Sequence, residues 1–375
     1  YCFIIGLVKK NEVVHRLIFV GVISSMSLLI AYVSGFPLAN IFADGNAYLF
    51  YLLIFPMLYV VPQISKESLL SVLFGALVIL SVKTLLTLAI FSNSLSLSQQ
   101  WYLWVRDLRF GEITYINLSF FRIFFQSQVL LLPAMAFIAS YIVHRKKDIK
   151  REERFILLGL LSFFVASILL SLSRSFWVGG FTGAIAFISF LSLYRKELLS
   201  NLRTVIGYFL TASIIGIFFL SAAQSFSFDT SVLLYRFGDL QDEPAVASRW
   251  SLLPVVAEEI REMPLFGSGF GKEITYITSD PRIIASSGGT GEYTTFSLEW
   301  GYFDIWLKMG LIGLLALLYL FWYFLALQLK NMRQNGDNWY AFGASISLVM
   351  LSVLHFFTPY LNHPIGIGYL VLGLL

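Results

Sequence analysis

Arginine is the prevailing cation in the polar segments on one side of the apolar stretches of this chain. When those stretches are assigned as membrane spans, 24 of the 26 basic residues fall in the loops: eight Arg and Lys272 on this side, eight Lys and seven Arg on the other. A guanidinium group offers a rigid fork that matches two oxygens of a phosphate or carboxylate, whereas an ammonium group is a point charge. The arginine-rich side is therefore expected to bind an anion with phosphate-like geometry.

Four arginines are the leading candidates for this anion site. Arg174 lies in a three-residue turn between two predicted spans, at the expected depth of lipid phosphates, and Arg122 begins a span in the sequence FFRIFFQSQ. Arg236 and Arg249 lie in a long polar segment further along the chain. Each has an ordinary alternative: an interfacial anchor for Arg174, snorkelling to lipid head groups for Arg122, and surface salt bridges for the other two.

The two remaining basic residues, Lys83 and Lys308, fall inside predicted spans. Lys83 lies about 12 Å along a helix from Phe91, where the span ends. Because charged residues inside a membrane are often functional, Lys83 is a candidate for substrate binding, with partial snorkelling as the alternative. Lys308 lies near the end of its span and is expected to snorkel to the interface.

The composition predicts an all-α, polytopic integral membrane protein. The chain is 58% hydrophobic and 13% charged, with a mean hydropathy of +0.77, and a spanning helix needs roughly 20 apolar residues. About ten helices are expected once the apolar runs at both ends are counted, because Tyr1–Val8 and the run that ends at Leu375 resemble parts of further spans. The predicted complete spans are 17–36, 47–62, 69–90, 125–143, 155–172, 176–194, 204–222, 304–327 and 339–358.

The loops alternate between lysine-containing and arginine-rich segments. The densest basic segment is HRKKDIKREER at 144–154, and enrichment in Lys and Arg predicts that this side faces the cytoplasm. The net charge of +4 comes mostly from these loops and does not favour binding to nucleic acid. The single cysteine, Cys2, excludes an internal disulfide and a cysteine-based metal site.

The predicted organisation is an N-terminal bundle at 1–222, a large outer loop at 223–303 and C-terminal helices at 304–375. Within the loop, Ser248–Met263 predicts an amphipathic helix with Leu252, Leu253, Val256 and Ile260 on one face. PLFGSGFG follows at 264–271, where the glycines permit a tight turn or the close approach of a ligand. No Lys-Ser/Thr pair follows them, so this segment is not a nucleotide-binding P-loop.

Several of these segments, taken in order, resemble a known family. They are SLSRSFWVGG (171–180), RFGDL (236–240), ASRW (247–250), PLFGSGFG (264–271) and KMGLIGLL (308–315). Their order resembles the O-antigen ligase and O-antigen polymerase superfamily of bacterial surface-polysaccharide assembly. The resemblance implies a helical bundle under a large outer loop, with arginines that bind the diphosphate of a lipid carrier and no nucleotide or metal cofactor.

The chain departs from the family at one position. The family commonly has a His-Asn pair eleven residues before the first glycine of its GLIG-like motif, and counting back from Gly310 gives Glu299 followed by Trp300. The resemblance therefore implies Glu299 as the catalytic base, with Asp304 or Glu292 as substitutes. Tyr302 is a further candidate for substrate binding, with an interfacial aromatic belt as the alternative.

Together these observations predict a glycan transferase at the outer face of the bacterial inner membrane. By the resemblance, it moves an oligo- or polysaccharide from a polyprenyl-diphosphate carrier to a lipid or glycan acceptor, and its partners are that donor, the acceptor and membrane lipids. The alternative is a transporter or flippase of lipid-linked or anionic substrates. A transporter is expected to show internal repeats and ionisable residues or broken helices at mid-membrane, and neither is clear in the sequence.

Overall fold

Nine helical segments in the described residues are long and apolar enough to cross a membrane, and they coincide with the nine predicted spans. The structure is a computed structural model that describes residues 12–108, 110–117, 120–226, 244–335 and 338–374. The all-α, polytopic fold class is confirmed. The segments are Glu12–Val33, Leu38–Gln63, Lys66–Ser92, Gln126–Arg145, Arg151–Ser171, Arg174–Tyr194, Lys196–Ala223, Gly301–Gln334 and Trp339–Phe357.

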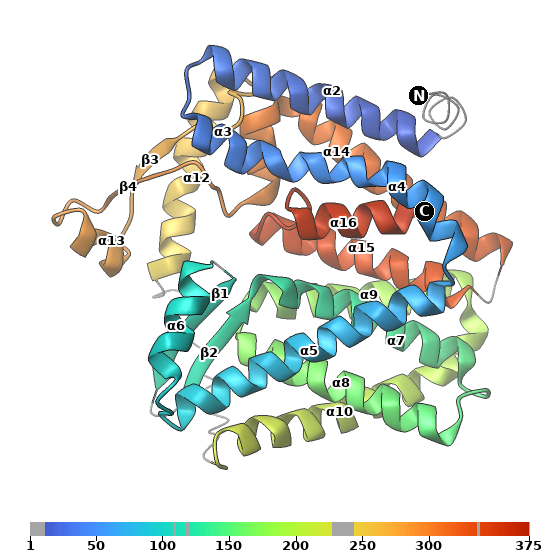
Figure 1. Cartoon of the computed structure of the whole chain (residues 1–375). Coiled ribbons are helices and arrows are strands. Elements are labelled where there is room, and N and C mark those ends of the chain that lie inside the picture. Colours follow the sequence, from blue (N-terminus) through green and yellow to red (C-terminus); the bar gives the residue numbers. More distant parts are fainter. Residues whose placement is uncertain (1–11, 109, 118–119, 227–243, 336–337, 375) are drawn as a thin grey trace. The chain divides into compact units, whose positions relative to one another are not determined.

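The chain folds as two compact units, each built from separate stretches of the sequence. One unit comprises 1–63, 239–327 and 351–375, and the other comprises 64–238 and 328–350. The predicted division into a bundle, a loop and C-terminal helices concerns the two sides of a membrane and stays a prediction. Figure 1 labels the helices and strands of both units.

The first unit contains α2 (Glu12–Val33), the helical segment α3 to η2 (Leu38–Gln63), α12 (Pro244–Glu262) and most of α14 (Gly301–Gln334). It also holds the end of α15 (Trp339–Phe357) and α16 (Pro364–Leu374). Helix α2 runs antiparallel to α14, because Arg16 contacts Tyr319 near one end and Ser27 donates a hydrogen bond to the carbonyl of Lys308 near the other. The two helices lie side by side in Figure 1.

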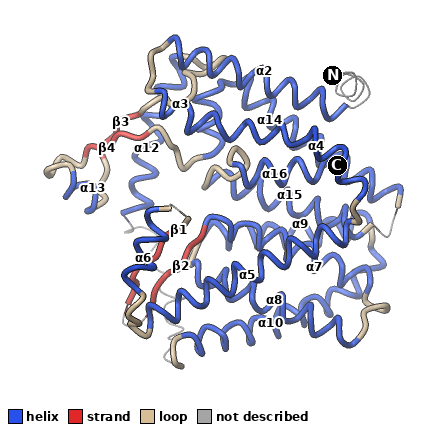
Figure 2. Tube along the Cα trace, viewed as in Figure 1, coloured by secondary structure: helices blue, strands red, loops and turns tan. Residues whose placement is uncertain are grey.

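The loop that the sequence predicts at 223–303 contributes a small layer to this unit. Helix α12 confirms the predicted amphipathic helix, and its Leu252, Val256 and Ile260 are buried against Ile274. Ile274 belongs to an antiparallel hairpin of β3 (Ile274–Ile277) and β4 (Glu292–Thr295), with the short helix α13 (Pro281–Ser286) between the strands. Figure 2 shows these strands in red beside α12.

The second unit is a helix bundle closed at one end by a hairpin. Its helices are α5 (Lys66–Ser92), α6 (Ser98–Asp107), η3 (Gln126–Leu130) continuing into α7 (Leu131–Arg145), α8 (Arg151–Ser171), α9 (Arg174–Tyr194) and η4 (Lys196–Asn201) continuing into α10 (Leu202–Ala223). The end of α14 and the start of α15 complete it.

Strands β1 (Gly111–Asn117) and β2 (Phe120–Phe125) pair antiparallel; β2 packs against α5 and α8, and β1 contacts α6. Ile123 and Phe125 of β2 are buried with Leu88, Leu170 and Leu220. This shared core fixes β2 against the ends of α5, α8 and α10.

Candidate functional site

Arg174 is the first residue of α9, placed there by a tight turn after α8. Leu172 adopts the left-handed conformation (φ 45°) that ends α8, and Ser173 is extended before α9 begins. The turn is held by hydrogen bonds from the Ser173 amide to Ser171 Oγ (3.2 Å) and between the Ser173 and Ser175 hydroxyls (2.9 Å). Arg174 is half-buried. Its guanidinium group therefore extends from a helix N-terminus, where backbone amides and the helix dipole favour an anion.

Arg122 lies in strand β2, whereas the sequence predicted that it begins a spanning helix. Its Nε donates a hydrogen bond to the carbonyl of Ser171 (2.8 Å), and Nη1 pairs with Glu112 of β1 (3.2 Å). The side chain is 19% exposed. Because Ser171 precedes Arg174 by only three residues, the hairpin brings the two predicted arginines to one turn. The alternative for Arg122, snorkelling to lipid head groups, is disfavoured because its guanidinium group is bound by Ser171 and Glu112.

Lys83 is enclosed by aromatic rings. Its Nζ lies 4.2 Å from the ring centroid of Phe125, 5.2 Å from that of Trp104 and 5.3 Å from that of Phe110. Three rings within about 6 Å of one ammonium group stabilise its charge by cation–π attraction. The half-buried lysine thus has a local structural role, and its predicted part in substrate binding stays a prediction.

Arg249 and Glu299, which are 50 residues apart in the sequence, form an ion pair in the first unit. The indole Nε1 of Trp300 donates to the backbone carbonyl of Arg249 (3.0 Å), and the Trp300 ring packs edge-on against Trp250. Trp300 is buried, whereas the paired side chains are about half exposed. The aromatic contact therefore fixes the carboxylate and the guanidinium group side by side at a solvent-accessible position.

Tyr302 lies in the first turn of α14 and points into the protein. Its hydroxyl donates to the carbonyl of Ser352 (2.8 Å), and its ring meets His355 edge-on at 4.7 Å. Ser352 and His355 both belong to the part of α15 within the same unit. The hydroxyl is thus bound within the protein, and a role in substrate binding stays a prediction.

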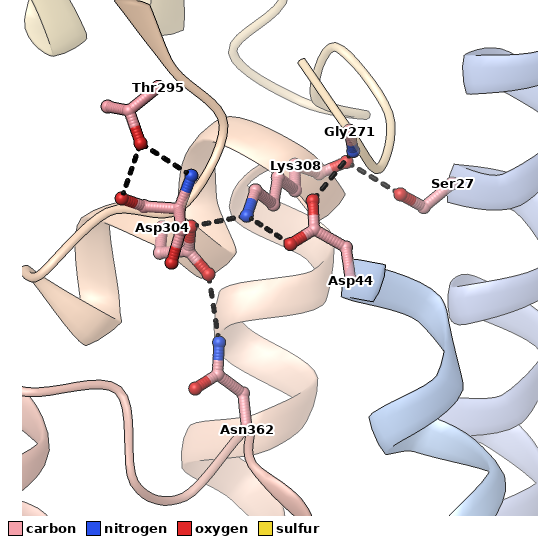
Figure 3. A network of polar contacts seen from close by, with 8 residues as sticks. Ser27, Asp44, Gly271, Thr295, Asp304, Lys308 and Asn362 are labelled. Atoms are coloured by element: carbon pink, nitrogen blue, oxygen red, sulfur yellow. Dashed lines mark hydrogen bonds and ion pairs between the residues drawn. The ribbon is translucent and has the colours of Figure 1, made fainter. Parts of the chain in front are cut away.

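Lys308 is buried in a network of charged groups, so the expectation that it snorkels was wrong (Figure 3). Its Nζ lies 2.8 Å from Asp44 Oδ1 and 2.6 Å from Asp304 Oδ1, and only 3% of its side chain is exposed. The other carboxylate oxygens accept hydrogen bonds from the Gly271 amide (2.6 Å) and from Asn362 Nδ2 (2.9 Å). Burying a lysine is tolerated when its charge is paired and hydrogen-bonded, and two carboxylates meet that condition here.

The glycine-rich segment 264–271 packs on α14 where that helix is broken. Gly310 has non-helical angles (φ 69°, ψ −177°), and the Leu311 amide donates to the carbonyl of Pro264 (2.9 Å). In return, the Ser268 and Gly269 amides donate to carbonyls of α14, at 2.7 and 3.1 Å. The sequence predicted either a tight turn or the approach of a ligand. The close approach is to the backbone of α14, and it supports the turn of helix that carries Lys308.

The candidate residues thus form two groups, one in each unit. Arg122 and Arg174 share the turn between α8 and α9, while Arg249 and Glu299 form the ion pair beside α12. Arg236 lies outside the described residues. No signal in the sequence pointed to Asp44. Asp304 and Lys308 lie four residues apart on a helix, and this spacing indicates that they pair.

Residues 157–318 match a family model described as O-antigen ligase. The matched segment includes Arg174, Arg249 and Glu299 together with the glycine-rich segment 264–271. No match was found among curated proteins or among solved structures.

Proposed function

Because the chain belongs to the O-antigen ligase superfamily through residues 157–318, we propose that it transfers a glycan from a polyprenyl-diphosphate carrier to an acceptor. The family consists of glycosyltransferase-like ligases, and the chain is a multi-pass bacterial membrane protein. We propose further that the acceptor is a lipid or a second glycan and that the reaction takes place at the outer face of the inner membrane.

The observation that carries the proposal is the pair of arginines at the turn between α8 and α9. When the glycosyl carbon leaves the carrier, negative charge develops on the phosphate oxygens. Arg174 and the N-terminus of α9 offer positive charge and backbone amides at one place. Arg122 is hydrogen-bonded to the carbonyl of Ser171, which precedes Arg174 by three residues. One well-placed donor contributes about 3–4 kcal/mol to stabilising such charge in a transition state.

Glu299 is the proposed base. In the reaction, the acceptor hydroxyl oxygen forms a bond to the glycosyl carbon, the bond from that carbon to the phosphate oxygen breaks, and its electron pair leaves with the diphosphate. The hydroxyl proton passes to the Glu299 carboxylate. A general base of this kind contributes about 10²- to 10⁴-fold to the rate. Asp304 suits this role less, because it is buried and both its oxygens are bound by Lys308 and Asn362.

Replacement of Arg174 by lysine tests the role of the guanidinium fork. Arg174→Lys keeps one positive charge but loses the paired donors, so we expect transfer to fall by at least a hundredfold while the protein still accumulates in the membrane. The measurement is glycan transfer by the purified protein in detergent, with a polyprenyl-diphosphate-linked donor and either a lipid or a glycan acceptor. Wild-type activity of the variant would refute the proposed role.

The same assay separates a transferase from a transporter. Detergent solution has no compartments, so a protein that only moves lipid-linked substrates across a bilayer forms no new glycosidic bond there. Product formed by the wild-type protein supports the transferase, and the acceptor that is used distinguishes ligase from polymerase.

Replacement of Glu299 by glutamine tests the base, with His363 as the matched control. We expect Glu299→Gln to lower the transfer rate about 10²- to 10⁴-fold with little change in donor binding. His363 is the relevant comparison because it is a histidine of the same unit as Glu299, and burial lowers its pKa below the ordinary value, which leaves its imidazole neutral at neutral pH. If His363→Gln abolishes transfer and Glu299→Gln does not, the base is misassigned.

A further inference from the structure

A groove of about 640 Å³ lies on the second unit between the first turns of α8 and α10. Both helices begin at the same end of the unit, since Gly216 of α10 packs against Ser162 and Ala166 of α8 further along. The groove is lined at α8 by Arg151, Arg154, Phe155 and Leu158, and at α10 by Thr204, Gly207, Tyr208 and Thr211. Arg151 and Arg154 belong to the basic segment 144–154, so the groove lies at the end of the helices where cationic residues are densest.

The two arginines of the groove are available to a ligand. Arg151 and Arg154 are exposed, three residues apart on one face of α8. Within the described part of the chain neither guanidinium group has an ion-pair partner, and Glu153 of the same turn is instead hydrogen-bonded to Tyr141 of α7 (2.5 Å). Two unpaired guanidinium groups beside hydroxyl side chains are suited to phosphate oxygens.

The α8 side of the groove also presents apolar surface, from Phe155 and Leu158. Phe155 is 64% exposed, and Leu210, beside the lining residue Thr211, is 62% exposed. Exposed large apolar side chains on a spanning helix face acyl chains. The free space continues at Gly207, where an added Cβ meets no atom within 4 Å. A ligand of this groove therefore has a phosphate at one end and hydrocarbon at the other.

We propose that this groove binds an anionic phospholipid, whose phosphate is held by Arg151 and Arg154 and whose acyl chains follow α8 and α10. Basic pockets between spanning helices bind the head groups of such lipids, and charge attraction at the cytoplasmic leaflet favours them. The site is separate from the proposed transfer chemistry, because Arg174 lies at the opposite end of the α8–α9 pair.

Native mass spectrometry of the full chain in detergent, with cardiolipin, phosphatidylglycerol or phosphatidylcholine added, tests the proposal. The wild-type protein is expected to retain the two anionic lipids at least tenfold better than phosphatidylcholine. Arg151→Gln combined with Arg154→Gln is expected to lose that preference by about tenfold or more. Arg145→Gln is the matched control, since Arg145 lies in the same basic segment but pairs with Asp148.

A second variant tests the shape of the groove without changing its charge. Gly207→Leu fills the open space at the floor and is expected to reduce retention of cardiolipin, whereas Gly75→Leu on α5, where an added Cβ also meets nothing, leaves it unchanged. The proposal is overturned if the double arginine variant keeps the wild-type lipid preference. It is equally overturned if millimolar inorganic phosphate displaces cardiolipin, since the groove then binds a free anion.

Discussion

Lys308 balances the charges of two carboxylates in the interior of the first unit. Replacing it by methionine leaves Asp44 and Asp304 buried with no cation, and breaking a buried ion pair in this way costs about 3–5 kcal/mol. We therefore expect Lys308→Met to lower the unfolding temperature in detergent, measured by scanning fluorimetry. Lys147→Met is the control, because Lys147 is exposed and surface substitutions usually change stability by less than about 0.5 kcal/mol.

A triple variant distinguishes the ion network from simple packing. Removing both carboxylates along with the lysine, as Asp44→Asn, Asp304→Asn and Lys308→Met, deletes all the charges together, so much of the lost stability is expected to return. An unfolding temperature for Lys308→Met equal to that of the wild-type protein would show that the network contributes nothing to the fold.

Whether the sequence could predict an ion pair depended on how far apart its two residues lie along the chain. Asp304 and Lys308 are one helical turn apart, so their pairing is readable from spacing, whereas Asp44 is 264 residues from Lys308. The ion pair of Arg249 and Glu299 likewise required the fold to bring together two distant segments. Residue types suited to phosphate chemistry are readable from the sequence, whereas their partners are not.

At the level of elements, the close packing of the glycine-rich segment 264–271 against the backbone of α14 requires glycine at position 267. Gly267 has φ +74°, and a Cβ there would lie 2.4 Å from the amide nitrogen of Gly310. We expect Gly267→Ala to destabilise the first unit strongly, measured as a lower unfolding temperature and faster limited proteolysis. Gly288→Ala is the matched control, because Gly288 also has a positive φ (+67°) but its Cβ would meet nothing. An equal fall in unfolding temperature in both variants would assign the effect to backbone strain of about 1–2 kcal/mol rather than to the packing of segment 264–271 against α14.

The long apolar elements were predictable and the short ones were not. Nine spans follow from length and composition alone, because an apolar run of that length has only one stable conformation in lipid. Strand β2 was instead assigned to the start of a helix, since a short apolar run such as FFRIFF fits a buried strand and a helix equally well by periodicity. That ambiguity matters for the candidate site, because β2 is the element that brings Arg122 to the turn before Arg174.

At the scale of the whole molecule, the spans fix which loops share a membrane face. Three candidate spans, Arg151–Ser171, Arg174–Tyr194 and Lys196–Ala223, separate Lys147 from Thr290, so we expect these two exposed residues to lie on opposite faces. The enrichment of Lys and Arg at 144–154 predicts that Lys147 lies in the cytoplasm. The proposed chemistry requires Thr290, on the same side as Arg174, to be outside.

Because Cys2 is the only cysteine, a Cys2→Ser background allows single cysteines to report this topology. In intact cells treated with a membrane-impermeant maleimide, Thr290→Cys is expected to be labelled, and Lys147→Cys only after permeabilisation. Both positions lie on exposed segments, so labelling differs by access and not by burial. The reverse pattern would place the Arg122–Arg174 turn in the cytoplasm, where transfer at the outer face is impossible. Labelling of both residues in intact cells would contradict three crossings between them, and with it the assignment of α8, α9 and α10 as spans.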